Sequence, residues 1–442
     1  MGRLFGTDGV RGRYGDELTD ELARMLGSAA ARVLRRHRSG PVTFAIARDP
    51  RASGAALEAA LVDGITSAGG DVYRLGIQPT PVVAFLTSAV GAWSGVMISA
   101  SHNPPEDNGI KFFSSDGFKL SDDLEDEIEA TLGERVADAT TSGRELEPPS
   151  DLPDYVEHVL STAEATLDGM RILVDCANGA ASEIAPRVLR ELGADVIALN
   201  ADPDGSNINV GCGALHPEVV AAAVLEHGAD AGVAHDGDAD RALFADARGN
   251  VVDGDHVLAA SALAMHEDGR LKNDLIVATV MSNIGLRIAM REAGIEVEET
   301  PVGDRYVLER MEQRGAILGG EQSGHVIFRE FATTGDGLIT STRFLSLAAR
   351  KGVTVEGLAA AMHRYPQVLV NVEVARKEAL ADESSIWELV DDVGSTLGDG
   401  GRVLVRASGT EPLVRVMVEA QTEEVARRHA DAIAEAVRST IG

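Results

Sequence analysis

Cysteine is nearly absent from this chain of 442 residues, which contains Cys176 and Cys212 and no other. Neither residue stands in a spacing typical of metal ligands, and two cysteines cannot build the disulfide framework of a small secreted protein. We therefore expect a reducing, cytoplasmic environment.

Long apolar runs are missing as well. No stretch of about 18 apolar residues is available to span a bilayer. The opening "MGRLFGTDGVRGR" contains no apolar segment of the kind found in secretory signals. We expect a protein without a membrane anchor.

Positive charge is scarce: 40 lysines and arginines stand against 70 aspartates and glutamates, which gives a formal net charge of −30. Such a field repels nucleic acid and anionic membrane surfaces, so both classes of partner are excluded. An anionic substrate would need arginines gathered at one place, which makes clustered arginines the positions to follow.

A strand, a turn and a helix recur along the chain, and each helix leads into a further strand. The repeated segments are Val42 to Gly54, Met170 to Ser182 and Asp274 to Gly285, and the further strands begin near Asp71, Asp195 and Ile295. This order is typical of βαβ units in sheets that are covered on both faces.

The last segment has a different pattern. "QVLVNVEVARK", "GRVLVRAS" and "LVRVMVEAQ" alternate like antiparallel strands. A helix from about Thr422 follows, with Val425, His429, Ile433 and Val437 on one stripe. The sequence thus predicts an α/β protein with three tandem α/β domains, whose mixed sheets are sandwiched by helices, and a smaller C-terminal α+β domain, arranged around a central cleft. Breaker-rich segments place these domains at residues 1–150, 151–254, 255–366 and 367–442.

A serine stands at the end of a short apolar strand in "GVMISASHNPPEDNGIK", residues 95–111. Prolines 104 and 105 and the pair Asn108-Gly109 mark a loop, after which Lys111 follows. Adjacent residues on an extended chain point to opposite sides, so Ser101 and His102 are not expected to form the hydrogen-bonded pair of a hydrolase. A turn serine bonded to its own backbone is the alternative.

Three aspartates alternate with small residues in "AHDGDADRALF". Asp236, Asp238 and Asp240 would repel one another unless a cation were present, and Mg²⁺ takes oxygen ligands of this kind. Arg241 follows directly, as a site for a transferring phosphoryl group would require. A solvated acidic turn is the alternative.

The segment "VRASGTEPLVRV" combines a turn with flanking arginines. Ser408, Gly409 and Thr410 offer hydroxyls and backbone amides, and Arg406 and Arg415 flank them. Such a turn can bind a phosphate. A hairpin turn with solvated arginines is the alternative.

Polar side chains also alternate in "LGGEQSGHVIF", where Glu321, Ser323 and His325 fall on one side of a short loop. This set suits a ligand rich in hydroxyls, and an imidazole can transfer protons near neutral pH. A structural histidine is the alternative.

Read in order, "FGTDGVRG", "ISASHNP" with "DNGIKFF", "DGDADRALF", "GEQSGH" and "RASGTEP" resemble the α-D-phosphohexomutases over nearly the entire chain. Within that family, residues 203–217, residues 300–311 and Gln322 most resemble members that act on glucosamine phosphates. The resemblance implies an isomerase that interconverts the 6-phosphate and 1-phosphate of a hexose. It would work through a phosphoserine and a bisphosphorylated sugar and would feed amino-sugar nucleotide and cell-wall precursor synthesis.

The resemblance implies a role for each matched position. Ser101 would carry the phosphoryl group, with His102 in support. One Mg²⁺ per active site would be held by Ser101, through its phosphate, and by Asp236, Asp238 and Asp240. Lys111 and His325 would be the proton donor and acceptor, and Arg11 and Arg241 would neutralise charge. The substrate-binding residues would be Glu321, Ser323, Gly303, Asp304, Arg406, Ser408, Gly409, Thr410 and Arg415.

The implied partner is a small phosphosugar, with a bisphosphorylated sugar as activator, and the chain would be a monomer or a homodimer. A phosphomannomutase/phosphoglucomutase of the same family, a metal-dependent sugar phosphatase and a non-catalytic phosphosugar-binding protein are the alternatives. Ala239 stands where relatives often have glycine, and the alanine is tolerable provided that its backbone angles are ordinary.

Overall fold

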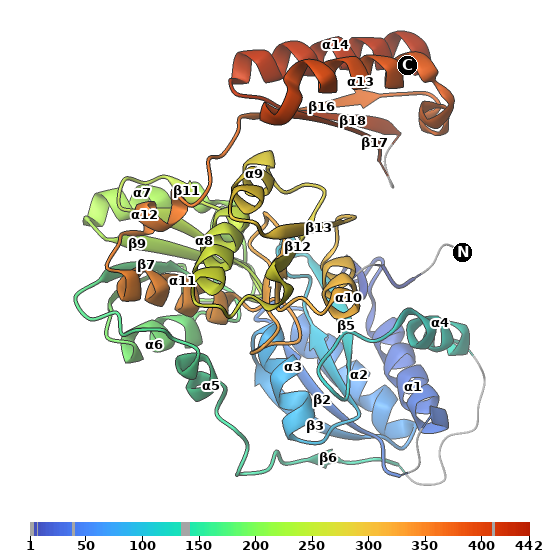
Figure 1. Ribbon diagram of the computed structural model, residues 1–442. Helices are drawn as coiled ribbons and strands as arrows, with labels where there is room; N and C mark the ends of the chain where they lie inside the picture. The colour runs from blue at the N-terminus through green and yellow to red at the C-terminus, as the bar shows by residue number, and fades with distance from the viewer. Residues whose placement is uncertain (1–3, 7, 38–39, 134–141, 409–411) are drawn as a thin grey trace. The chain divides into compact units, whose positions relative to one another are not determined.

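The computed structural model describes residues 4–6, 8–37, 40–133, 142–408 and 412–442 (Figure 1). The chain divides into two compact units. Unit 1 comprises Met1–Val280 and Ile295–Ala360, and unit 2 comprises Met281–Gly294 and Ala361–Gly442.

The first sheet of unit 1 has the strand order β1-β5-β4-β2-β3-β6. Strands β4, β2, β3 and β6 are parallel neighbours, whereas β5 runs antiparallel to both β4 and β1. Its elements are β1 (Val10–Arg13), α1 (Asp20–His37), β2 (Thr43–Arg48), α2 (Gly54–Ser67), β3 (Asp71–Ile77), α3 (Thr80–Ala89), β4 (Ser94–Ile98), β5 (Asp107–Ser114), α4 (Asp122–Thr131) and β6 (Glu145–Leu146).

Helices cover both faces of this sheet, because residues 44–47 of β2 and 96–98 of β4 are buried and apolar and successive side chains point to opposite sides. Ile46 and Val96 belong to the core under α1 and α2. Their chain neighbours Ala47 and Met97 pack with α3 on the other face (Figure 1).

The second sheet has the strand order β11-β10-β9-β7-β8, with β9, β7 and β8 parallel. Helix α7 packs on one face through Val220 and Val224, and Phe244 of β10 meets Phe344 of α11 with ring centroids 4.6 Å apart. The elements are α5 (Tyr155–Ser161), β7 (Arg171–Asp175), α6 (Ile184–Glu191), β8 (Asp195–Leu199), η1 (Gly213–Leu215), α7 (Pro217–His227), β9 (Ala231–His235), β10 (Ala242–Asp246) and β11 (Val251–Val252).

The third sheet has the strand order β13-β12-β14-β15. Helix α10 covers one face, where Val307 and Met311 pack with Val277. The elements are α8 (Gly254–Glu267), η2 (Lys272–Asp274), β12 (Leu275–Thr279), β13 (Glu296–Thr300), α10 (Asp304–Arg314), β14 (Leu318–Gly320), β15 (Val326–Phe328), α11 (Gly337–Lys351) and α12 (Val355–Ala359).

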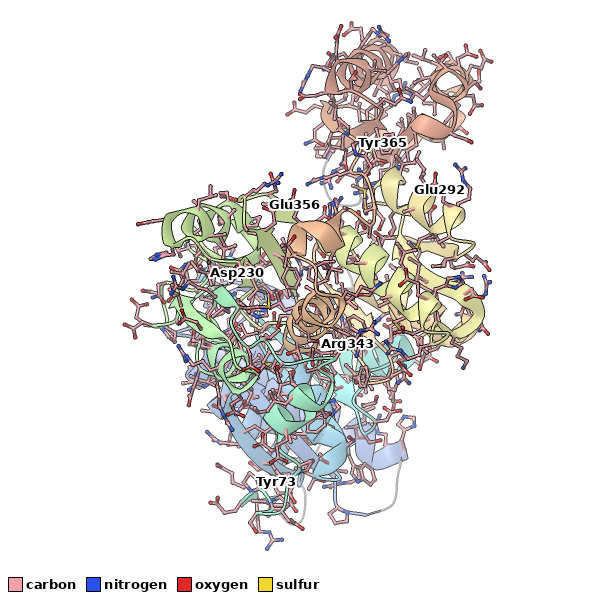
Figure 2. All side chains as sticks on the ribbon, turned by 60° about the vertical axis from the view of Figure 1, so that its left-hand side comes forward. Tyr73, Asp230, Glu292, Arg343, Glu356 and Tyr365 are labelled. Atoms are coloured by element: carbon pink, nitrogen blue, oxygen red, sulfur yellow. The ribbon has the colours of Figure 1, made fainter. Side chains whose placement is uncertain are left out.

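A buried arginine ties α11 to the chain that follows α5. Arg343 (Figure 2) donates to Thr162 O at 3.0 Å and to Glu164 Oε1 at 2.7 Å. Its guanidinium also lies 4.9 Å from the ring centroids of Phe328 and Phe331. The charge is therefore both paired and stacked, as burial requires.

Unit 2 contains the antiparallel sheet β16-β18-β17 and α9. Buried Glu419 accepts from Asn283 Nδ2 at 3.0 Å and from Ile284 N at 2.9 Å, which joins the start of α9 to the sheet. The elements are α9 (Ile284–Glu292), β16 (Gln367–Glu373), η3 (Lys377–Asp382), α13 (Ser384–Leu397), η4 (Gly398–Gly400), β17 (Arg402–Ala407), β18 (Leu413–Glu419) and α14 (Glu423–Ile441).

The predicted fold class is confirmed, with mixed α/β sheets followed by a smaller antiparallel domain. Two details differ. Asn108 and Gly109 lie inside β5 rather than in a loop, so Lys111 is a strand residue. Helix α14 buries Ala430 and Ile433, while His429 is only half-buried, because the small alanines let the helix lie close to the sheet. Among the described residues, no helix is both long and apolar enough to cross a membrane.

Helices α1 and α2 cross at two glycines. A Cβ at Gly64 would fall inside van der Waals contact with Arg24 O, and one at Gly27 would do the same with Leu61 O. Because both obstacles are backbone atoms, neither helix could yield locally.

We expect Gly64→Ala to lower the free energy of unfolding by about 1–3 kcal/mol, because this overpacking outweighs the higher helix propensity of alanine. Gly394→Ala in α13 is the control, since a Cβ there would meet nothing within 4 Å. Denaturant titrations measure both changes, and a more stable Gly64→Ala protein would contradict the packing argument.

A second prediction concerns Asp336, which accepts from Leu338 N and Ile339 N at the start of α11 and from Tyr155 Oη at 2.7 Å. Burial raises the pKa of this carboxyl to about 6. The folded state therefore holds the proton more tightly than the unfolded chain, so this group's contribution to stability falls as pH rises from about 4 to about 6.

Asp336→Asn keeps the acceptor for both amides and cannot ionise. We expect the unfolding midpoint of the variant to rise relative to that of the parent between pH 4 and pH 6, measured in parallel denaturant titrations. Curves that stay parallel across this range would show that the carboxyl does not titrate there.

Candidate active site

Ser101 lies in the turn that follows β4, in a left-handed backbone conformation with φ of 52°. Its side chain is buried, and its Oγ donates to Asp236 Oδ2 at 2.6 Å. Its backbone N donates to Ser99 Oγ at 2.8 Å. The structure thus brings the predicted serine against the first predicted metal ligand, although they are 135 positions apart.

The prediction that Ser101 and His102 would point apart is wrong. Ser101 Oγ lies 3.2 Å from His102 Nδ1, because the left-handed turn removes the alternation of an extended chain. Burial and the guanidinium groups of Arg241 and Arg11 lower the pKa of His102 to about 4. A neutral imidazole therefore stands beside the hydroxyl at pH 7.

The three aspartates lie in the turn between antiparallel β9 and β10. All are buried, and one carboxylate oxygen from each falls within 4.8 Å of the others. Ala239 has φ of 56°, so the condition of ordinary backbone angles is not met there. The left-handed residue turns the chain back so that Asp238 and Asp240 face the same point.

These residues fit a divalent cation. Burial and the charges of Asp240 and Asp238 raise the pKa of Asp236 well above its usual range. Asp238 Oδ1 and Asp240 Oδ1 are buried and have no hydrogen-bond partner among the described residues. Oxygen atoms in this state are suitable ligands for a hard cation such as Mg²⁺.

A set of cations surrounds the aspartates. Lys111 Nζ lies 2.9 Å from Asp238 Oδ2 and 3.0 Å from Asp8 Oδ2. Burial opposes the charge of Lys111, but Asp238 and Asp8 outweigh it and raise its pKa above the ordinary value. Lys111 is therefore an ammonium at neutral pH. Lys119 also belongs to this set and pairs with Asp8 at 2.5 Å and with Asp304.

The two predicted arginines lie at the same place. Arg11 of β1 pairs with Asp8, and Arg241 lies 4.0 Å from Asp236 and 3.8 Å from Asp240 through its Nε. Within the described chain, the Nε atoms of both arginines are buried without a hydrogen-bond acceptor. Both guanidinium groups can therefore bind an additional anion.

His325 lies between β14 and β15, with Nδ1 3.5 Å from Asp240 Oδ2. Burial lowers its pKa, but Asp240 outweighs burial and raises it to about 9. The amide of Gly335 donates to Nε2 at 3.1 Å, which requires that nitrogen to be unprotonated. The proton of the ring therefore lies on Nδ1, toward Asp240 Oδ2.

The other predicted residues of unit 1 lie next to these groups. Glu321 Oε1 accepts from Gly303 N at 3.1 Å, and Asp304 Oδ2 lies 3.8 Å from His325 Nε2. Ser323 Oγ is buried and has no partner in the part of the chain that the structure describes. These groups can supply hydrogen bonds to hydroxyls.

The predicted phosphate turn belongs to unit 2. Arg406 and Arg415 face each other in register on β17 and β18, and burial and the Arg415 charge lower the pKa of Arg406. Lys377 donates to Ser408 O at 2.9 Å. Gly409 and Thr410 lie outside the described residues. Like charges opposite each other on neighbouring strands favour an anion as their partner.

Sequence reasoning gave no role to Thr80, Asp8, Lys119 or Lys377. Thr80 Oγ1 donates to Asp238 Oδ2 at 2.6 Å from the start of α3. A threonine directly before a proline, a pair found at helix starts, and a lysine shortly after the "DNGIKFF" motif were the signals available. Neither signal points to the aspartates, which come from a different sheet.

Family models of the phosphoglucomutase/phosphomannomutase proteins match most of the chain. Domain I matches residues 2–137, domain II residues 153–249, domain III residues 253–365 and the C-terminal domain residues 369–436. The first three are described as alpha/beta/alpha domains.

Relatives match over the full length. The phosphoglucosamine mutase of Rhodococcus jostii is 54% identical over 99% of this chain and 100% of its own. That of Thermobifida fusca is 54% identical over 100% and 99%. The crystal structure of a phosphoglucomutase/phosphomannomutase family protein from Burkholderia thailandensis is 26% identical, covers 99% of this chain and 97% of its own, and has a TM-score of 0.82. The chain belongs to the phosphoglucomutase/phosphomannomutase family, the α-D-phosphohexomutases.

Proposed function

We propose that this chain interconverts glucosamine 6-phosphate and glucosamine 1-phosphate through a phosphorylated Ser101 and a bisphosphorylated sugar. The observation that carries the proposal is the contact of Ser101 Oγ with Asp236 Oδ2 at 2.6 Å, beside two buried carboxylates with oxygens that accept no hydrogen bond from the described residues. Relatives named phosphoglucosamine mutase, 52–54% identical over at least 99% of the chain, support the choice of sugar.

In the first half-reaction, the bond between phosphorus and Ser101 Oγ breaks and a bond between phosphorus and a sugar oxygen forms. The sugar hydroxyl loses its proton to a base, for which we propose His325 in its neutral form, with Nε2 exchanging the hydrogen bond from Gly335 N for one from the hydroxyl. The serine oxygen takes up a proton, for which the ammonium of Lys111 is the donor. The second half-reaction runs these steps in reverse with the other phosphate, so the enzyme regains its phosphoserine.

Charge on the transferring group is stabilised by residues that are already fixed. Arg241 and Arg11 each have a buried Nε without an acceptor among the described residues, and preorganised donors of this kind are the usual source of such stabilisation. Asp236, Asp238 and Asp240 would hold Mg²⁺ together with a phosphate oxygen on Ser101. When bound, the ion would withdraw charge from that phosphate.

The sugar must turn around between the two half-reactions, so its binding residues have to accept two poses. We propose that Glu321, Ser323, Gly303 and Asp304 bind its hydroxyls. Arg406, Ser408, Gly409, Thr410 and Arg415 would bind whichever phosphate is not reacting. The predicted domain boundaries stay a prediction, as do the monomeric or dimeric state and the activating bisphosphate.

Ser101→Ala is expected to abolish mutase turnover and to leave sugar-phosphate binding in place, because it removes only the oxygen that carries the phosphoryl group. Coupled assays after priming with a bisphosphorylated sugar, run with glucosamine, glucose and mannose 6-phosphates, measure turnover. Intact mass measures the phosphate ester. Ser88→Ala, at an exposed position of α3, is the control.

Full turnover in Ser101→Ala would contradict the covalent route. Faster turnover of glucose or mannose phosphate would move the assignment to another sugar, and release of free phosphate without isomerisation would identify a phosphatase instead.

Mg²⁺ is expected to stabilise the folded chain, by about 2.7 kcal/mol at a free concentration of about 100 times its Kd. Asp238→Asn should lose this stabilisation, because it removes one anionic ligand. Asp230→Asn is the control, since Asp230 lies just before β9 on the surface (Figure 2). Thermal unfolding with and without Mg²⁺ measures the effect, and an equal shift in both variants would place the ion elsewhere.

A further inference from the structure

A fully buried arginine lies in the turn between β2 and α2, within the first repeated segment but outside the motifs of the candidate site. Arg51 is 1% exposed. Its Nε donates to Asp49 Oδ2 at 2.9 Å, which pairs the charge. A guanidinium held this far from water needs a partner for each of its donors.

Those partners are backbone carbonyls of the turn that carries Ser101. The Nη2 atom of Arg51 donates to Ser101 O and to Asn103 O, both at 2.9 Å. The Nη1 atom donates to Asp107 O at 2.9 Å and to Pro104 O. An arginine has five N–H donors in a fixed plane, and here all five are used.

A second donor approaches the same turn from the second sheet's domain. Asn209 Nδ2 donates to Ser101 O at 2.9 Å and to Asn103 O at 3.0 Å. A Cβ at Gly237, in the aspartate turn, would lie 2.6 Å from Ser101 O and 2.9 Å from Asn209 Nδ2. The serine turn, the aspartate turn and Asn209 therefore pack so closely that a side chain at position 237 would not fit between them.

The backbone on both sides of Ser101 depends on one ion pair. Ser101 O accepts from Arg51, and Ser101 N donates to Ser99 Oγ. Ser99 Oγ in turn donates to Asp49 Oδ2 at 2.6 Å, the oxygen that pairs with Arg51. A non-glycine residue at φ of 52° is conformationally unfavourable. These bonds hold it there.

We propose that Arg51 and Asn209 are positioning residues for phosphoryl transfer, which hold the 101–107 turn so that the oxygen of Ser101 stays against the aspartates. This inference rests on the proposed function. Neither residue touches the reacting atoms. Their effect is on the geometry of the serine, so it should fall on kcat rather than on KM.

The first test is Arg51→Lys, which keeps the charge and has three donors in place of five. We expect kcat to fall about 10- to 100-fold, as for a misplaced reacting group, with KM changed less than about threefold. Intact mass should show less phosphoserine after priming with glucose 1,6-bisphosphate. Arg48→Lys is the matched control, since Arg48 bonds Glu58 and Asp49 O but not the serine turn.

The second test does not alter a buried charge pair. Asn209→Asp keeps the shape of the side chain but places an oxygen against the carbonyls of Ser101 and Asn103. Asn207→Asp is the control, since it makes the same change of charge on the same loop, and Asn207 Nδ2 donates to Asp202 O. We expect the loss of kcat in the first variant alone. Normal kcat in folded Asn209→Asp and Arg51→Lys would overturn the proposal.

Hydrogen exchange of the amides in residues 99–109 gives a readout that does not need turnover. We expect faster exchange in Arg51→Lys and Asn209→Asp than in the two controls, at equal global stability. Unchanged exchange would overturn the proposal. If the parent chain shows no turnover with any sugar phosphate, the proposed function fails, and exchange still decides whether these residues hold the turn.

Discussion

Three carboxylates lie within 4.8 Å of one another in the interior of unit 1, and the residues around them are arranged to offset their repulsion. Lys111, Arg241 and His325 come from three different segments of the chain, and each lies near one of the aspartates. Thr80 Oγ1 also donates to Asp238 Oδ2. Even so, Asp238 Oδ1 and Asp240 Oδ1 accept no hydrogen bond from the described residues. These oxygens could therefore serve as ligands for a divalent cation.

The cations around these buried carboxylates also explain how a protein of strongly negative net charge can bind a phosphorylated sugar. Away from the site, its field would repel the substrate. At the site, cations are gathered in one place: Asp8 is held ionised between Lys111, Lys119 and Arg11, against the effect of burial, with its pKa well below the usual range. Asp8 thereby has its counter-charges, and the Nε–H groups of Arg11 and Arg241, which have no acceptor among the described residues, are left for phosphate.

The sequence could predict the elements and most of the residues that the structure brings together near Ser101, since strand ends, alternating aspartates and family motifs are local patterns. It could not predict that Ser101 and Ala239 take left-handed angles, because that depends on contacts between distant segments. Arg51 was missed for the same reason. Its five acceptors are backbone carbonyls and one carboxylate, and carbonyls have no signature in a sequence.

Helix α9 gives the last domain an unusual attachment. The chain passes from unit 1 to unit 2 at residue 280, returns at 295 and passes over again at 360. Glu419 and Asn283 bind α9 to the terminal sheet inside unit 2. A protease that cuts between residues 360 and 367 would therefore not release residues 367–442, because α9, still joined covalently to unit 1 at both of its ends, would retain them. Separation needs two further cuts, one on each side of α9, or the loss of that buried contact.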